Sequence, residues 1–327
     1  MTPRRTVAVV TEMTYRPLGD SGLMVSAVGV GCNAFGRRVD LDGVRDILDA
    51  AQDVGVTLLD TADTYGGQGA SEQMLGEALQ GRRDEFVVAT KFGMDMQGAN
   101  GPDRGARGSR AYVRRAVESS LRRLRTDYLD LYQYHEPDGV TPIEETLSVL
   151  ADLVHEGKVR YVGVSNVAGW QVADADWSAR TNGFERFVSV QNRYSLLDRA
   201  VEAEVVPACE EYGLGLLPYF PLEYGLLTGK YRRGQGAPAG SRADLDPSRA
   251  QWLQDADWDR IEAVEKYAEA RDLSVLDVAI AGLAAQPAVS SVISGATSGD
   301  QVRTNAAALR WEPTESDLVE LDEITSR

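Results

Sequence analysis

Four side chains capable of acid-base chemistry follow consecutive short apolar runs in the sequence. Asp60 and Tyr65 belong to the segment LLDTADTYG, Lys91 to VVATKFG and His135 to YLDLYQYHEPD. A phenol is a weak acid with an ordinary pKa of about 10, but a neighbouring ammonium favours the phenolate. We therefore expect Lys91 to lower the pKa of Tyr65, Asp60 to hold Lys91, and His135 to orient a substrate oxygen. The set predicts proton transfer to a carbonyl oxygen, with these four residues as the catalytic group.

A purely structural interpretation of the same residues is also open. Asp60 and Lys91 would then form an ion pair, Tyr65 would be a half-buried aromatic, and His135 a satisfied polar group at a strand end. For any one residue this interpretation is favoured. The four together favour an enzyme, because perturbed titratable groups gather at active sites.

These residues fall within a regular alternation of strand-like and helix-like segments. Short β-branched runs alternate with longer amphipathic stretches, separated by Gly, Asp, Asn or Pro. We expect strands at residues 27–31, 57–61, 86–90, 128–132, 159–164, 187–190, 214–218 and 291–293. We expect helices at residues 42–54, 71–80, 110–124, 143–155, 169–179, 201–212, 258–271 with 275–285, and 299–309. Gly55 and Gly213 stand where two helices should end in a left-handed residue.

Eight strand-helix repeats predict an α/β fold of one closed parallel sheet, a (β/α)8 TIM barrel. The catalytic candidates follow the second, third and fourth strands, where active sites of such barrels lie. Before the first repeat, two short strands around Gly19-Asp20-Ser21-Gly22 predict a hairpin that closes the N-terminal mouth. After the seventh strand, residues 222–257 form a long connection. We expect one domain over residues 14–327, preceded by a flexible extension over residues 1–13.

Composition excludes several classes of function. Of the 327 residues, 43% are hydrophobic and 26% charged, and the formal net charge of −16 opposes binding to nucleic-acid phosphates or anionic lipid. No apolar run approaches the roughly 20 residues that a membrane-spanning helix needs. Cys32 and Cys209 are the two cysteines of the chain, so neither a disulfide framework nor a metal site is expected. We expect a cytoplasmic protein with no nucleic-acid or membrane partner.

The motifs, taken in order, resemble those of the aldo-keto reductases. DTADTYG is similar to the family's Asp/Tyr segment, ATKFG to its lysine segment, and YQYH to its histidine segment. EGKVRYVGVSN, SVQNRYS, YFPLEYGLLTGKY and VISGATSGDQVRTN also resemble family motifs, from about Tyr15 to the end of the chain. The resemblance implies a barrel that binds NADP(H) and transfers a hydride to or from an aldehyde, ketone or sugar carbonyl. It implies neither a metal nor the Gly-rich dinucleotide fingerprint, which this sequence lacks.

The resemblance also implies a set of cofactor contacts. Those to the nicotinamide and its ribose follow the first, second, fifth, sixth and seventh strands: Gly31, Cys32, Asn33, Asp60, Ser165, Asn166, Gln191 and Tyr219. Those to the phosphates and adenosine lie in the long loop and near the last strand: Phe220, Leu222, Gly225, Lys230, Arg242, Gly295, Thr297, Gln301 and Asn305. The family often has serine at the position of Phe220, so one side-chain hydroxyl contact of the family is not expected here.

The chemistry of individual side chains suits the cofactor contacts that the resemblance implies. Amide side chains suit the nicotinamide carboxamide, which needs donors and acceptors, and Tyr219 suits ring stacking. Lys230 and Arg242 favour NADP(H) over NAD(H), because a 2′-phosphate needs a cationic seat, although both could instead be solvated loop cations. The helix opening at Gly299 is expected to favour an anion. Cys32 has no histidine base, so we interpret it as a small packing residue.

Two further functions stay open. Potassium-channel β-subunits and bacterial aldehyde or sugar reductases resemble the same branch, so the alternative is a cofactor-binding regulatory subunit with little turnover. In those subunits the position matching His135 can be asparagine, so His135 favours turnover. A lyase or isomerase that uses the barrel without nicotinamide is a third interpretation. The substrate, the reaction direction and the choice between monomer and homo-oligomer are not encoded in any motif.

Overall fold

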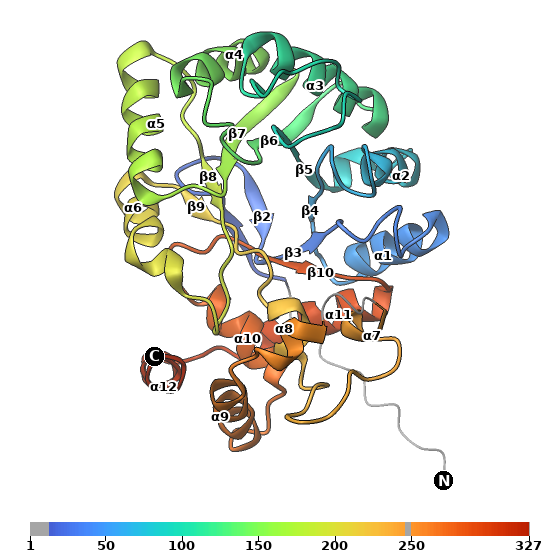
Figure 1. Ribbon diagram of the computed structural model, residues 1–327, viewed down its shortest axis with the longest axis vertical. Helices are drawn as coiled ribbons and strands as arrows, with labels where there is room; N and C mark the ends of the chain where they lie inside the picture. The colour runs from blue at the N-terminus through green and yellow to red at the C-terminus, as the bar shows by residue number, and fades with distance from the viewer. Residues whose placement is uncertain (1–12, 246–249, 327) are drawn as a thin grey trace.

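Eight parallel strands form a barrel surrounded by helices in a computed structural model that describes residues 13–245 and 250–326 (Figure 1). The strands are β3 (Val28–Gly31), β4 (Leu58–Asp60), β5 (Val87–Phe92), β6 (Leu129–Tyr134), β7 (Val159–Ser165), β8 (Ser189–Gln191), β9 (Gly215–Leu216) and β10 (Val292–Gly295). They pair in the order β10-β3-β4-β5-β6-β7-β8-β9. Parallel bridges from Leu216 to Val289 and from Tyr219 to Ile293 join the two ends of this sheet. The predicted (β/α)8 barrel is confirmed.

Helices cover the outer face of the sheet, as Figure 1 shows. They are α1 (Leu41–Asp53), α2 (Ala70–Ala78), α3 (Arg110–Leu124), α4 (Ile143–His155), α5 (Gly169–Asn182), α6 (Val205–Tyr212), α9 (Trp258–Glu269), α10 (Val275–Ala284), α11 (Gly299–Ala307) and α12 (Glu315–Thr325). Their apolar faces pack on the outward-facing strand side chains and form the main core. None of the described helices is long and apolar enough to cross a membrane.

The N-terminal mouth of the barrel is closed by a hairpin, as predicted. Strands β1 (Tyr15–Pro17) and β2 (Met24–Ser26) pair antiparallel. Leu18, Leu23 and Val25 of this hairpin pack with side chains from several barrel strands in an apolar cluster. The barrel interior at the N-terminal ends of the strands is therefore filled by apolar side chains. The open mouth of the barrel, where an active site can form, lies at the C-terminal ends of the strands.

The barrel interior near the C-terminal ends of the strands is polar. Lys91, Asp60, Gln133 and Gln191 are buried there, and Asp60 receives hydrogen bonds from the other three. Buried polar groups must be hydrogen-bonded, and a charge must be paired, for a core of this kind to be stable. This polar layer lies between the apolar interior at the N-terminal ends of the strands and the open mouth at their C-terminal ends.

The long connection after β9 contains short helices. They are η3 (Glu223–Thr228), α7 (Arg242–Leu245) and α8 (Ala250–Gln254). Trp252 and Leu253 of α8 pack around Tyr231 and Ile261, which ties the connection to α9. The connection is thus a folded segment over its described residues.

Several element boundaries differ from those predicted. β5 continues to Phe92 and β6 to Tyr134, so Lys91 lies inside a strand, whereas the sequence predicted it beyond the strand end. The predicted helix over residues 201–212 is divided into η2 (Ala200–Ala203) and α6, because Glu204 between them has non-helical φ and ψ of −137° and −42°. Helix α12 was not predicted, although Thr314 and Asp317 form a capping box at its start.

The predicted helix stops are confirmed, with φ of 75° at Gly55 and 68° at Gly213. The predicted helix over residues 299–309 ends as α11 followed by η5 (Ala308–Arg310). Residues 1–12 of the expected N-terminal extension lie outside the described residues. Met13 packs, partly buried, against the main core.

Candidate active site

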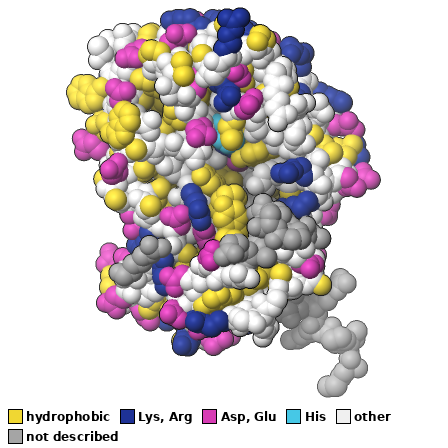
Figure 2. All heavy atoms as spheres, in the orientation of Figure 1, with side chains coloured by type: hydrophobic (Ala, Val, Ile, Leu, Met, Phe, Trp, Pro, Cys, Tyr) yellow, Lys and Arg dark blue, Asp and Glu magenta, His cyan; other side chains and the backbone are white. Residues whose placement is uncertain are grey.

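A cavity of about 770 Å³ opens where the barrel strands end. Figure 2 shows that face of the molecule hollowed near its centre. The lining comes from the C-terminal ends of the barrel strands and the loops after them, from the connection after β9, and from α10 and α11. Among the predicted site residues the lining includes Gly31, Asn33, Asp60, Tyr65, His135, Ser165, Asn166, Gln191, Tyr219, Phe220, Leu222, Gly225, Lys230, Gly295, Thr297, Gln301 and Asn305.

A buried ammonium joins two of the catalytic candidates. Lys91 Nζ lies 2.7 Å from Asp60 Oδ2, 3.0 Å from the Thr61 carbonyl oxygen and 3.3 Å from Tyr65 Oη. The Lys91 side chain has no exposed surface. Burial opposes the charge of Lys91, but Asp60 and Tyr65 raise the pKa of Lys91 above its usual value overall. The ammonium is therefore charged and held against the phenol.

Tyr65 lies in the turn between β4 and α2, half-buried at the cavity wall. Its backbone N–H donates to Ala62 O, and its carbonyl accepts from the Ser71 N–H at the start of α2. Burial raises the pKa of Tyr65, and the Lys91 ammonium opposes this. Lys91 thus acts in the expected direction, but the overall pKa of the phenol is raised, because desolvation outweighs the ammonium.

Asp60 is fixed on both oxygens. Oδ2 accepts from Lys91, and Oδ1 accepts from Gln191 Nε2 at 2.8 Å and from Gln133 Nε2 at 3.4 Å. The carboxylate therefore cannot rotate away without losing several buried hydrogen bonds. This arrangement holds the Lys91 ammonium at one position below Tyr65.

His135 directly follows β6 and faces Tyr65. The two rings meet edge to face with centroids 5.8 Å apart. The His135 N–H donates to Phe92 O at 2.7 Å, and Asn166 Nδ2 donates to His135 O at 2.9 Å. Burial and the charge of Lys91 lower the pKa of His135 to about 3. A neutral imidazole at the cavity wall can donate one hydrogen bond to a bound oxygen.

Amide and hydroxyl groups gather beside this end of the cavity. Ser165 Oγ donates to Gln191 O at 2.7 Å, and the Tyr219 hydroxyl donates to Asn166 Oδ1 at 2.7 Å. Asn166 has a φ of 57°, a left-handed conformation that asparagine tolerates better than most residues. The group offers donors and acceptors that suit a ligand amide.

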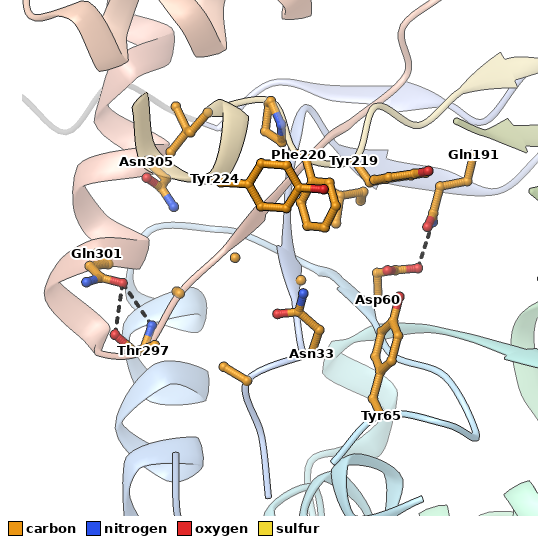
Figure 3. A pocket seen from close by; sticks show the side chains of 18 of the residues that line it. Asn33, Asp60, Tyr65, Gln191, Tyr219, Phe220, Tyr224, Thr297, Gln301 and Asn305 are labelled. Carbon is orange, nitrogen blue, oxygen red and sulfur yellow. Dashed lines mark hydrogen bonds between the residues drawn. The ribbon is translucent and has the colours of Figure 1, made fainter. Parts of the chain in front are cut away.

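The turn after β9 has an unusual backbone. Phe220, Glu223 and Tyr224 have φ of 55°, 45° and 55°, and Gly225 has 103°. Each left-handed L-residue costs roughly 1–2 kcal/mol, so such residues persist where the surroundings hold them and they gather at functional sites. The Phe220 and Tyr224 rings lie 4.4 Å apart and both line the cavity (Figure 3). Turns of this kind can direct successive N–H groups at an anion.

The far end of the cavity is formed by α11 and the segment before it. Gln301 Oε1 accepts from the Thr297 N–H at 2.9 Å and lies 3.2 Å from Thr297 Oγ1. Figure 3 shows Thr297, Gln301 and Asn305 at this end and Asp60, Tyr65 and Gln191 at the other, with the Phe220 and Tyr224 rings between them. The cavity is therefore elongated, with polar groups at both ends.

Comparison with known proteins decides the family. The profile of the Aldo/keto reductase family matches residues 27–326. This chain belongs to the aldo/keto reductase family. Membership supports an oxidoreductase activity, and aldo-keto reductases generally use NAD(P)H.

Three relatives with different names are similar to this chain over most of its length. A rice protein named "Probable voltage-gated potassium channel subunit beta" is 36% identical over 306 residues, 91% of both chains. "Uncharacterized oxidoreductase YrpG" of Bacillus subtilis is 37% identical over 306 residues, again 91% of both chains. "Probable aldo-keto reductase 1" of Glycine max is 35% identical over 321 residues, 96% of this chain and 90% of the relative.

Two predicted contacts differ from the rest of this aldo/keto reductase site. Cys32 is fully buried with Sγ 3.5 Å from Val30 O, and it is not among the described lining residues. Its position fits the interpretation as a packing residue. Arg242 begins α7, but its side chain lies outside the described part of the chain.

The anion expected at the start of α11 is a protein carboxylate, since the Gly299 N–H donates to Asp46 Oδ2 at 2.7 Å.

Other lining residues of the aldo/keto reductase cavity were missed by sequence reasoning. They include Arg38, Thr64, Met94, Glu136, Thr228 and Leu276. Thr64 and Glu136 stand next to Tyr65 and His135, and this proximity could have suggested them. Arg38 lies in the loop between β3 and α1 and also lines the cavity. Thr228 and Leu276 reach the cavity through tertiary packing, which no local pattern encodes.

The lining fits an extended nicotinamide dinucleotide. Amide and hydroxyl groups stand beside Tyr65, the left-handed turn stands at the middle, and Lys230 lines the wall. Lys230 is exposed and has no ion-pair partner within residues 13–245 and 250–326, so its charge is open to a ligand anion. The residues can thus hold an amide, a pair of phosphates and an adenosine group in that order along the cavity.

Proposed function

We propose that this oxidoreductase reduces an aldehyde, ketone or sugar carbonyl to an alcohol with NADPH, in a reversible reaction with Tyr65 as general acid. The observation that carries the proposal is the buried Lys91 ammonium, 2.7 Å from Asp60 and 3.3 Å from the Tyr65 hydroxyl. An ammonium at that distance stabilises the phenolate that remains after proton transfer. NADPH supplies the hydride when it is bound.

The catalytic residues divide the work. Tyr65 donates its proton to the substrate oxygen as negative charge develops there. Lys91 stabilises the resulting phenolate, and Asp60 keeps Lys91 charged and in place. His135 is neutral, and it donates a hydrogen bond that orients the substrate oxygen toward Tyr65. With these roles, His135 stays neutral throughout the reaction.

The cofactor contacts are proposed for the remaining lining residues. Ser165, Asn166 and Gln191 would hold the nicotinamide amide, and Tyr219 would stack on the ring. The turn at Phe220 to Gly225 would meet the two phosphates. Lys230 and Arg242 would meet the 2′-phosphate, which favours NADPH over NADH. Buried free cysteines are compatible with a cytoplasmic location, which we also propose.

A turnover assay tests the proposed function. Purified protein is mixed with NADPH and a panel of aldehydes, ketones and sugars, and the loss of NADPH absorbance is followed at saturating cofactor. We expect carbonyl-dependent oxidation of NADPH in the wild type and its loss in Tyr65→Phe. Equal rates with and without every carbonyl, together with normal NADPH binding, would exclude the reductase.

A cofactor-binding regulatory subunit is the second candidate. It is favoured by the 36% identity to the rice protein named as a probable channel β-subunit. Such a subunit would bind NADPH tightly but consume little of it. His135 favours turnover, since it provides a hydrogen-bond donor next to Tyr65. The same assay separates the candidates, because NADPH fluorescence titration measures binding and absorbance measures consumption.

A further inference from the structure

A buried carboxylate outside the cavity lining holds the left-handed turn after β9. Glu223 is 5% exposed and forms an ion pair with the Arg193 guanidinium through Oε1. Its Oε2 accepts a hydrogen bond from Ser195 Oγ at 2.8 Å. Arg193 Nε is also 3.0 Å from Asp198 Oδ2. Glu223 is therefore bound on both oxygens by the segment that follows β8.

The neighbours of Glu223 shape the middle of the cavity. Phe220, Tyr224 and Gly225 line it, whereas Glu223 and Arg193 are not among the described lining residues. The Arg193 guanidinium lies 5.5 Å from the centre of the Tyr224 ring. The ion pair is thus one residue away from the cavity wall and supports it from behind.

The backbone at Glu223 and Tyr224 needs this support. Both residues have positive φ, a conformation that an L-residue leaves unless contacts hold it. Within the turn, the Glu223 N–H donates to Phe220 O and the Gly225 N–H to Leu222 O, and the Tyr224 ring meets Trp252 edge to face. The contacts of Glu223 with Arg193 and Ser195 join this turn to the segment after β8 by hydrogen bonds, in addition to the contact of Arg193 with the Tyr224 ring.

We propose that Glu223 is a positioning residue whose contacts with Arg193 and Ser195 latch the turn formed by residues 220–225 in the shape that receives the dinucleotide phosphates. The inference rests on the proposed function, since it concerns the same cofactor. Without the latch, the turn relaxes to right-handed conformations, and a smaller fraction of the protein is ready to bind. The apparent dissociation constant rises in proportion to that loss.

The latch acts on a part of the cofactor that NADPH and NADH share. Loss of the latch therefore weakens both dinucleotides by the same factor, whereas loss of a 2′-phosphate contact weakens NADPH alone. Because Glu223 does not touch the reacting atoms, the rate of the chemical step at saturating cofactor is unchanged. These two features separate a positioning role from a general loss of structure.

The experiment compares the full-length wild type with Glu223→Gln, Arg193→Gln and the double variant. Dissociation constants for NADPH and NADH are measured by fluorescence titration, and NADPH release by stopped-flow displacement. We expect Glu223→Gln to raise both dissociation constants about tenfold, because a hydrogen-bonded charge pair is lost. We expect the single-turnover rate at saturating NADPH to change less than twofold. The double variant should bind the dinucleotides no more weakly than Arg193→Gln, since the pair between Glu223 and Arg193 is already broken in that variant.

The matched control is Asp176→Asn. Asp176 is also 5% exposed and paired with two arginines, Arg180 and Arg186, but it lies on α5 and outside the described lining. It reports the effect of losing a buried ion pair elsewhere. Ser195→Ala is a milder variant that removes one hydrogen bond of the latch. It keeps the test available should Glu223→Gln fail to fold, and we expect about a threefold rise in both dissociation constants.

The outcomes are distinguishable. An equal rise for NADPH and NADH that Asp176→Asn does not show supports the latch. Unchanged dissociation constants in Glu223→Gln or, where that variant is unfolded, in Ser195→Ala overturn it. A change confined to NADPH also overturns it, because the contact would then belong to the 2′-phosphate. Absence of any dinucleotide binding by the wild type overturns the proposed function and the latch together.

Discussion

The Lys91 ammonium lies 3.3 Å from the phenolic oxygen of Tyr65, and the Lys91 side chain has no exposed surface. Water cannot screen a charge so placed, so the ammonium acts on the phenol at close range. Burial nevertheless raises the pKa of Tyr65 in the protein alone. Tyr65 is therefore protonated at neutral pH, as a proton donor must be, while its conjugate base has a cation beside it.

The first prediction concerns Tyr65→Phe. The change removes the hydroxyl and keeps the ring, so we expect NADPH affinity within about twofold of wild type. Carbonyl reduction should fall by about 100-fold or more, which is the usual contribution of a general acid. Stopped-flow single turnovers and fluorescence titration measure the two quantities. Tyr128→Phe is the control, because its hydroxyl binds Asp84 at an exposed site. Unchanged reduction in Tyr65→Phe would remove Tyr65 from the mechanism.

The second prediction concerns Lys91→Met. This change leaves the Asp60 carboxylate buried without its cation, and breaking a buried pair costs about 3–5 kcal/mol of folding free energy. We expect lower stability and loss of reduction. The double variant Lys91→Met with Asp60→Asn should recover part of the stability, because no charge is then left unpaired, but none of the activity. Urea unfolding followed by circular dichroism measures stability. Equal stability of the single and double variants would contradict the pairing argument.

The barrel and the meeting of the four catalytic candidates were predictable from the sequence for one physical reason. Strand ends of a parallel barrel lie at the same face, so residues at the ends of successive strands meet there whatever the loops do. Asp60 ends β4 and His135 follows β6, as that argument requires. Lys91 lies one residue inside the end of β5 and still reaches Tyr65, because its side chain is long and points into the barrel.

Features that depend on tertiary contacts were not predictable. The sequence contains no local signal that Gln133 and Gln191 donate to Asp60, since the three residues lie far apart in the chain. The left-handed conformation at Tyr224 opposes the intrinsic preference of tyrosine, so only its surroundings explain it. Likewise, the Asp46 carboxylate at the Gly299 N–H comes from a helix about 250 residues earlier.

The third prediction concerns pH and His135. The imidazole has a pKa of about 3 in the folded protein, against an ordinary value near 6.5. Between these values the unfolded chain binds the proton and the folded protein does not, so unfolding is favoured as pH falls. The stability that neutral His135 provides is therefore present above pH 6.5 and is lost as pH falls toward 3.

We test this with His135→Asn, which cannot take up the proton. The wild type should lose stability relative to His135→Asn by about 1 kcal/mol for each pH unit between pH 6 and pH 4. Other titrating groups are common to both proteins and cancel in the comparison. Parallel unfolding curves for the two proteins over that range would show that His135 titrates alike in both states.

The fourth prediction concerns the choice between NADPH and NADH. Lys230 lines the cavity without an ion-pair partner among the described residues, and Arg242 belongs to the same connection. If these cations hold the 2′-phosphate, Lys230→Ala and Arg242→Ala should each weaken NADPH binding by about tenfold or more and leave NADH binding within twofold of wild type.

Arg232→Ala is the matched control, because Arg232 lies close to Lys230 in the chain but is paired with Glu265 at 2.7 Å. Dissociation constants at low and at 0.5 M salt complete the test, since the NADPH advantage should shrink with salt in the wild type and be small in Lys230→Ala at both. A preference for NADPH that survives both substitutions would assign the 2′-phosphate to other residues of the cavity.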